Sequence, residues 1–287
     1  MKYATAILLA LLLIAAPMTA LAEAEAPESP SLLGEGQTLT VDLDGDGAEE
    51  EVSWSMVPTE YDDCLALRVR TAGGEELTYV TEILFQQSVY ATDLDGDGAM
   101  ELLLTGDLMS DDYCTLCLRY GEGELYEVLF PDCTRGDSGT GYYKYGYGLV
   151  TELGDGGLTL TGSQDMLGTW FCSRQMTLTA HDRFEFCDDG LWRRDPQNLE
   201  DDEQWQYGAL TTRVNLPYVD ENGNAAVLAP GTQLMITATD KEERAWFVTR
   251  DGAAGMLSVS FDYERGWGFL VDGVPEDDCF EYVPYAD

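Results

Sequence analysis

Two short segments of the sequence carry three aspartates at alternate positions, interleaved with glycines. The first runs from Asp42 to Glu50 and the second from Asp93 to Glu101, so the pattern recurs after 51 residues. Carboxylates in one tight turn repel one another, and the glycines let the chain curl so that they converge. Convergence is favourable when a cation lies at the centre. Because hard oxygen ligands without histidine or cysteine favour calcium, each segment is predicted to bind Ca²⁺.

An EF-hand is the obvious alternative for an aspartate-rich loop. It requires a bidentate glutamate at position twelve of the loop and a helix after it. Here position twelve is Ser53 or Leu104, and the following residues alternate as in a strand. A second alternative is a pair of Asp/Gly turns without metal, although such turns rarely need three aligned acids.

The pattern D-x-D-G-D-G-x-x-E before a strand resembles the calcium loops of integrin-alpha-type FG-GAP and VCBS repeats, over residues 37–143. The resemblance implies blade-like β units that hold calcium, with position seven donating its backbone carbonyl. Glutamate stands at position nine, where these repeats usually have aspartate. The ligands implied for two Ca²⁺ sites are Asp42, Asp44, Asp46, Ala48 and Glu50, and Asp93, Asp95, Asp97, Ala99 and Glu101.

Most of the chain after residue 36 alternates between apolar and polar residues with period two. Residues 51–56, 65–70 and 234–239 are examples, each bounded by Gly, Asp or Asn. Such short alternating runs predict a mainly β protein.

The 51-residue repeat predicts small antiparallel β units, shaped like propeller blades and stacked on their neighbours. Residues 42–195 have room for about three units, whereas a closed propeller usually needs at least about four blades. A closed propeller is therefore not expected. The third unit, residues 142–192, is rich in predicted strands but has no acidic loop.

The N-terminal residues have the features of an export signal. One positive charge precedes an apolar run and the small residues of Ala20-Leu21-Ala22, so residues 1–22 are predicted to be a signal peptide. Residues 23–36 are acidic and rich in Pro and Ser, which predicts a flexible leader. We therefore expect a secreted protein or one of the bacterial cell envelope, with no transmembrane segment after cleavage. An uncleaved N-terminal anchor is the alternative.

Two folded regions are predicted after the leader: a calcium-binding β-repeat domain at 37–195 and a small β-barrel domain at 205–287, joined by a polar linker at 196–204. Residues 210–283 resemble a bacterial Src-homology-3-like barrel. This resemblance implies binding to cell-wall peptide or another envelope polymer, although Met256 stands where the family usually has tryptophan. The motifs that carry it are Val214-Asn-Leu-Pro-Tyr218, Leu228-Ala-Pro-Gly-Thr-Gln-Leu-Met-Ile236, Trp246-Phe-Val-Thr249 and Gly252-Ala-Ala-Gly-Met256.

Charge and composition exclude several classes of function. The chain has 54 acidic and 15 basic residues, a formal net charge of -39, which argues against binding nucleic acid or anionic membranes. His181 is the only histidine, so a triad-type hydrolase would depend on it alone, and a surface turn is the simpler interpretation. The chain is therefore predicted not to be an enzyme.

The function expected is calcium-dependent binding or adhesion, to an envelope polymer or an extracellular protein. A secreted hydrolase acting on cell wall or polysaccharide, and a spacer that binds nothing, are the alternatives.

Three smaller patterns admit more than one interpretation. Cys114 and Cys117 have the spacing of a metal or redox pair, but in a strand they point to opposite faces. The seven cysteines are therefore interpreted as buried thiols or as one or two disulfides, with at least one unpaired. Residues 135–138 match an integrin-recognition motif that often arises by chance. The tyrosines near 142–147 are typical of a core but would also suit a sugar-binding face.

Overall fold

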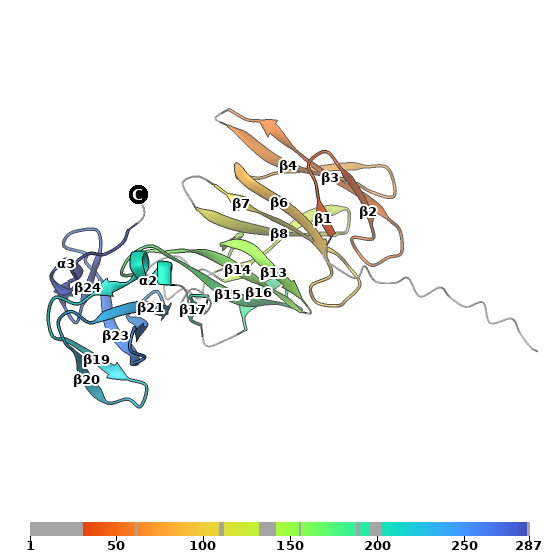
Figure 1. Cartoon of the computed structure of the whole chain (residues 1–287). Helices are drawn as coiled ribbons and strands as arrows, with labels where there is room; N and C mark the ends of the chain where they lie inside the picture. The colour runs from red at the N-terminus through yellow and green to blue at the C-terminus, as the bar shows by residue number, and fades with distance from the viewer. Residues whose placement is uncertain are drawn as a thin grey trace, which may run out of the picture.

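The computed structural model describes residues 31–60, 62–108, 112–131, 142–154, 156–187, 190–195 and 202–285. Nearly all regular structure in these ranges is β, and the strands within each sheet pair antiparallel. Figure 1 shows sheets that follow one another along the molecule, and the described strands do not close into a propeller or a barrel. The prediction of a mainly β fold without a closed propeller is confirmed.

The first repeat forms a four-stranded sheet in sequence order. Its strands are β2 (Thr38–Val41), β3 (Glu50–Pro58), β4 (Asp63–Arg70) and β5 (Glu76–Val80). The first acidic loop connects β2 to β3, and a strand follows it rather than the helix of an EF-hand. A hairpin turn at residues 72–74 connects β4 to β5.

The second repeat has the same four-stranded meander. Its strands are β6 (Phe85–Thr92), β7 (Glu101–Asp107), β8 (Tyr113–Gly121) and β9 (Glu124–Val128). The second acidic loop connects β6 to β7, as the first connects β2 to β3. Two further strands extend this sheet, β1 (Ser31–Leu33) beside β6 and β12 (Tyr145–Tyr147) beside β8.

Strand β1 lies inside the segment expected to be a flexible leader. Leu33 is buried, and its carbonyl accepts a 2.7 Å hydrogen bond from Trp54 Nε1. The end of that segment is therefore part of the folded sheet, because it supplies an apolar residue and pairs with the otherwise open edge of β6.

A third meander follows without an acidic loop, as the sequence indicated. Its strands are β13 (Leu149–Gly154), β14 (Gly157–Gln164), β15 (Trp170–Thr179) and β16 (Arg183–Phe186). A separate pair, β10 (Phe130–Pro131) and β11 (Tyr142–Tyr143), precedes it. Strand β17 (Trp192–Arg193) pairs with both β15 and β21, so this sheet continues into the C-terminal region. Residues 202–204 of the predicted linker begin helix α2 (Asp202–Gly208).

The C-terminal strands belong to the same thirteen-stranded sheet. These strands do not close into the barrel that the sequence suggested, because β20 (Ala225–Leu228) and β25 (Val274–Pro275) each pair with only one neighbour among the described strands. A short helix, α3 (Glu276–Cys279), follows the last strand. The strands are β18 (Leu210–Thr211), β19 (Leu216–Asp220), β20 (Ala225–Leu228), β21 (Gln233–Thr239), β22 (Arg244–Thr249), β23 (Ala254–Phe261), β24 (Phe269–Val271) and β25 (Val274–Pro275).

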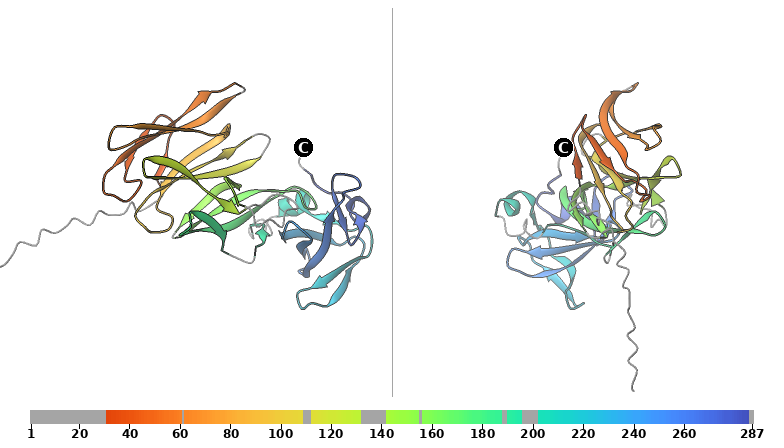
Figure 2. Two further views of the ribbon diagram at one scale, coloured as in Figure 1. Left: turned by 180° about the vertical axis from the view of Figure 1, so that it is seen from behind. Right: turned by 90° about the vertical axis from the view of Figure 1, so that its right-hand side faces the viewer.

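The second sheet is buried on both of its faces. Every residue of β7 is buried: Leu102 and Leu104 pack in a core shared with the first sheet, and Leu103 packs in a core shared with the third. Both views of Figure 2 show the three sheets in succession, coloured orange, yellow and green. Strand β7 therefore has buried residues on both faces, whereas strands of the outer sheets alternate between buried and more exposed residues.

Cysteine positions follow the same geometry. Cys114 packs in the core with the first sheet and Cys117 in the core with the third, so the two thiols lie on opposite faces as predicted. None of the six cysteines among the described residues forms a disulfide, and five of them are buried. The predicted signal peptide, Cys133 and residues 135–138 lie outside the described residues. No described helix has the length and apolar character needed to cross a bilayer.

Candidate metal centres

The first acidic loop is anchored on the neighbouring repeat. Leu43, its second residue, is buried in the core between the first and second sheets. The Leu43 carbonyl accepts a hydrogen bond of 3.3 Å from the backbone N–H of Met100, at the end of the second loop. Gly45 and Gly47 have φ angles of 73° and 87°, in the left-handed region where a side chain causes strain. These features fold the loop back on itself beside β3.

Backbone N–H groups orient the outer carboxylates of this loop. The two oxygens of Asp42 accept hydrogen bonds of 2.8 Å from Gly45 and Gly47. Glu50 is buried; its Oε2 accepts from Leu43 at 3.1 Å and its Oε1 from Ala72 at 3.4 Å. These donors are neutral, so they fix the carboxylates without cancelling their charge.

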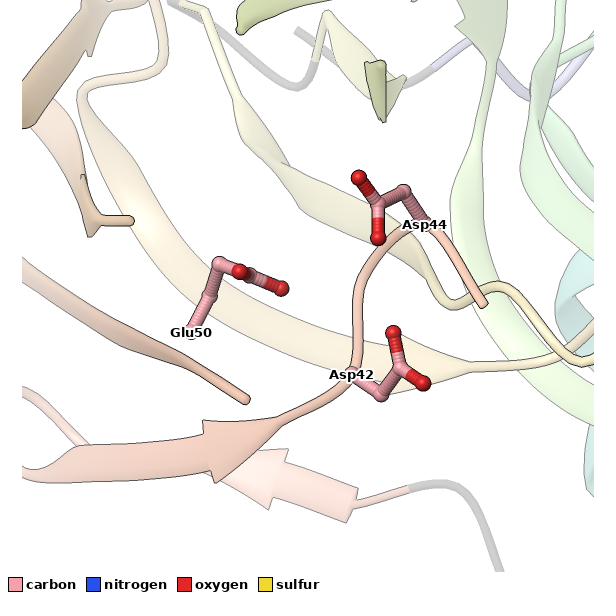
Figure 3. Close-up of side chains that lie close together, drawn as sticks. All are labelled: Asp42, Asp44 and Glu50. Atoms are coloured by element: carbon pink, nitrogen blue, oxygen red, sulfur yellow. The ribbon is translucent and has the colours of Figure 1, made fainter. Parts of the chain in front are cut away.

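Three carboxylates of the first loop converge. One oxygen from each of Asp42, Asp44 and Glu50 lies within 4.8 Å of the others. Figure 3 shows Glu50 extending toward the turn that carries the two aspartates. Within the described part of the chain, no lysine, arginine or histidine forms an ion pair with these three residues. We call Asp42, Asp44 and Glu50 the first cluster.

The second loop has nearly the same hydrogen bonds as the first. Asp93 accepts hydrogen bonds from Gly96 at 2.7 Å and from Gly98 at 3.0 Å, and Glu101 Oε2 accepts from Leu94 at 2.7 Å. Oxygens of Asp93, Asp95 and Glu101 lie within 4.8 Å of one another, and these residues form the second cluster. Leu94 is buried between the second and third sheets, as Leu43 is one sheet earlier.

An arginine enters the second cluster, whereas no arginine among the described residues pairs with the first. Arg119 Nε lies 2.6 Å from Glu101 Oε1, and Arg119 Nη2 lies 2.7 Å from Asp95 Oδ2. Arg119 Nη1 donates at 2.7 Å to Asp182, in the β15–β16 turn of the third sheet. The side chain of Arg119 is only 11% exposed, so this is a buried ionic network that joins two sheets.

In the second cluster, burial and ion pairing shift the pKa values of the charged groups in opposite directions. Burial raises the pKa of Glu101 to about 7, against the lowering effect of the Leu94 N–H and of Arg119. Burial alone would lower the pKa of Arg119, but the charge of Glu101 and the hydrogen bonds to carboxylates raise it overall. Arg119 is therefore a permanent positive charge at this position.

The register of the hairpins explains why only one loop has an arginine. Leu102 pairs with Leu118 in the second repeat, so the next position places Arg119 opposite Glu101. Glu51 pairs with Arg70 in the first repeat, so the equivalent step places Thr71 opposite Glu50. Arg70 instead lies on the surface, 3.6 Å from Glu51. Sequence reasoning missed Arg119, because only the register of the β7–β8 hairpin places it opposite Glu101.

The remaining predicted ligands lie at the edge of each cluster. Asp46 and Asp97 are exposed, and each accepts a hydrogen bond from the alanine two residues later, at 2.7 Å to Ala48 and 2.9 Å to Ala99. Asp97 Oδ2 also lies 3.4 Å from Arg119. The structure therefore brings together three of the four predicted carboxylates in each loop. The carbonyl ligands at Ala48 and Ala99 stay predictions.

The chemistry of both clusters fits a hard cation. Each offers carboxylate oxygens without histidine or cysteine. In the second cluster Asp95 Oδ1 is buried and has no hydrogen-bond partner among the described residues, which leaves one acceptor for an ion even with Arg119 present. In the first cluster no lysine, arginine or histidine of the described residues forms an ion pair with the carboxylates. Both clusters can hold a metal ion, and the first has the larger uncompensated charge.

His181 is the one histidine on which a triad-type hydrolase would depend. It is exposed in the β15–β16 turn, where its backbone N–H lies 3.4 Å from Thr179 Oγ1. The adjacent Asp182 binds Arg119, and so it serves the second cluster.

Comparison with known proteins identified no relative of this chain. No model of a known protein family matches the chain, and neither curated proteins nor solved structures yielded a match. The two acidic clusters and the sheets that carry them are therefore the basis for inferring function.

Proposed function

We propose that this chain is an exported calcium-binding protein of stacked β-sheets, which acts by binding rather than by catalysis. The observation that carries the proposal is the first cluster, where Asp42, Asp44 and Glu50 converge on a point that no positive side chain of the described residues reaches. Three carboxylates held in this way destabilise the loop unless a cation shares their charge.

Calcium is the ion that suits these ligands best. Carboxylate and carbonyl oxygens on a flexible loop accommodate the long, variable bonds of Ca²⁺, whereas Mg²⁺ demands a near-ideal octahedron. We propose that both loops bind calcium and that the first binds it more tightly. At the second loop Arg119 already contributes a positive charge and shares oxygens of Asp95 and Glu101 with any incoming ion.

The binding role follows from the setting that the sequence predicts. A signal peptide predicts export, and the medium outside a cell supplies millimolar calcium, which suits sites of modest affinity. The proposed partner is a polymer of the cell envelope or an extracellular protein. Calcium would serve to hold the first and second sheets together, since the first loop spans their common core through Leu43.

The test is thermal unfolding of the chain that follows the predicted signal peptide, with millimolar calcium and with a chelator. For sites with Kd near ~0.1–1 mM, millimolar calcium adds about 0.4–1.4 kcal/mol per site, which raises the Tm by several degrees. Magnesium at the same concentration should do much less. Asp44→Ala combined with Asp95→Ala should abolish the calcium shift.

Asp220→Asn is the matched control for this experiment. Asp220 also accepts backbone N–H bonds in an exposed turn, from Asn222 at 2.9 Å and Asn224 at 2.8 Å, but it belongs to neither cluster. Its variant should keep the full calcium shift. Identical melting curves with calcium and with chelator in the unmodified protein would refute the calcium assignment.

A further inference from the structure

A cavity of about 410 Å³ lies where three parts of the fold meet. Its walls come from the start of β8, from β11 and β12, from the end of β14, and from the C-terminal region at Lys241 and Phe269. The volume is within the range of small-ligand pockets, roughly 300–1,000 Å³. The cavity shares no residue with either cluster.

Tyrosines provide most of the aromatic surface of this cavity. Tyr113, Tyr143, Tyr145 and Tyr147 all line it. Tyr143 is 53% exposed, and its ring lies 6.1 Å from that of Tyr145 at an angle of 58°. A tyrosine that keeps half of its surface in water beside a cavity offers a flat apolar face with a polar edge.

Three carboxylates, one amide and one hydroxyl also line the cavity. Glu82, Asp112 and Asp165 are exposed at the cavity, and Gln164 and Ser163 line the side formed by the end of β14. These groups accept and donate hydrogen bonds in several directions. The three carboxylates oppose the binding of an anion, because like charges repel within the partly desolvated site.

Two lysines already occupy the cation-binding faces of the rings. Lys241 Nζ lies 4.1 Å from the centre of the Tyr147 ring and 4.4 Å from that of Trp192. Lys144 Nζ lies 4.6 Å from the centre of the Tyr145 ring and 3.7 Å from Glu82. A cationic ligand would have to displace these ammonium groups or lie against them. The protein's own ammonium groups therefore cover the faces of Tyr145 and Tyr147, which leaves a cationic ligand no free cation–π contact with these two rings.

We propose that this cavity binds a neutral oligosaccharide. A pyranose ring combines an apolar face, which stacks on tyrosine, with hydroxyl groups that hydrogen-bond to carboxylates and amides. Tyr143 serves as the stacking platform, and Glu82, Gln164 and Asp165 receive the hydroxyl groups. The inference rests on the proposed binding function and names its ligand class, but it requires no calcium in the site.

The test is titration calorimetry of the full mature chain with defined hexasaccharides. The probes are cellohexaose, xylohexaose and chitohexaose, with fully deacetylated chitohexaose as a cationic match and a hexamer of galacturonate as an anionic one. We expect at least one neutral probe to bind and both charged probes to bind at least tenfold more weakly. No binding by any neutral probe, or preference for a charged one, would overturn the inference.

Two variants locate the binding. Tyr143→Ala should weaken the best neutral probe about tenfold, because it removes a stacking face. Tyr282→Ala removes a tyrosine of similar exposure, 69%, that does not line the cavity, and should leave the affinity unchanged. Equal effects of the two variants would place the saccharide elsewhere and refute the cavity as its site. The calcium shift of the Tm, measured on the same samples, reports separately on the proposed function.

Discussion

The two acidic loops have nearly the same sequence and backbone hydrogen bonds, yet they balance their charge in different ways. In the second loop Arg119 supplies a positive charge from within the chain and ties Glu101 to Asp182 of the third sheet. In the first loop neutral backbone N–H groups orient Glu50, and no positive side chain of the described residues replaces the arginine. The comparison shows that a loop motif predicts where carboxylates gather, whereas the opposite strand decides how much positive charge the protein itself places beside them.

Arg119→Ala should have the largest effect on stability. It leaves Glu101 and Asp95 without their buried partner and breaks the tie to the third sheet, which is expected to cost about 3–5 kcal/mol. Calcium should restore part of this loss, because the second cluster then lacks its internal cation. Urea unfolding with and without calcium measures both effects.

Arg70→Ala is the matched control for that variant. Arg70 ends the equivalent strand but is 63% exposed and pairs only with Glu51 at 3.6 Å, so its loss should cost about 0–1 kcal/mol. Equal destabilisation by the two substitutions would contradict the role given to Arg119.

Thr71→Arg should make the first loop resemble the second. It places a guanidinium opposite Glu50, at the position that Arg119 occupies opposite Glu101. We expect the calcium affinity of the first loop to fall about tenfold, a change of about 1.4 kcal/mol, while the calcium-free protein becomes no less stable. Calcium titration followed by the Tm measures the change. An unaltered calcium response would show that the opposite strand does not set the affinity.

Gly47→Ala should have a smaller effect, confined to the backbone. A Cβ at Gly47 meets no atom within 4 Å, so the cost is only that of a left-handed residue, about 1–2 kcal/mol at most. Gly98→Ala is the equivalent change in the second loop, where φ is 92° and the space is also open. Chemical denaturation of both variants should give similar losses. A large difference between the two losses of stability would show that the backbones of the two loops are not equivalent.

The sequence predicted the parts of the site that depend on local pattern. The alternation of residues predicted strands, the repeat predicted two equivalent meanders, and the glycines predicted that Asp42 and Asp93 begin tight loops. The opposite orientation of Cys114 and Cys117 followed from strand geometry alone. Each of these features is fixed within a few residues of chain.

The features that the sequence did not predict depend on long-range pairing. Arg70 ends β4 and Arg119 lies two residues before the end of β8, and only the register of each hairpin shows that Arg119 lies opposite the cluster and Arg70 does not. Strand β17 pairs with both the third meander and the C-terminal strands, although the sequence predicted a linker between these regions at residues 196–204. Strand β1 pairs with β6 from a segment whose composition suggested a leader. None of these contacts leaves a periodic signal.

Calcium titration by calorimetry tests the difference between the loops most directly. The samples are the unmodified chain after the predicted signal peptide, Asp44→Asn, Asp95→Asn and the control Asp220→Asn. We predict a tighter and a weaker binding phase in the unmodified chain and in the control. Asp44→Asn should remove the tighter phase and Asp95→Asn only the weaker one. Loss of the tighter phase in Asp95→Asn with its retention in Asp44→Asn, or no calcium binding at all, would contradict the account.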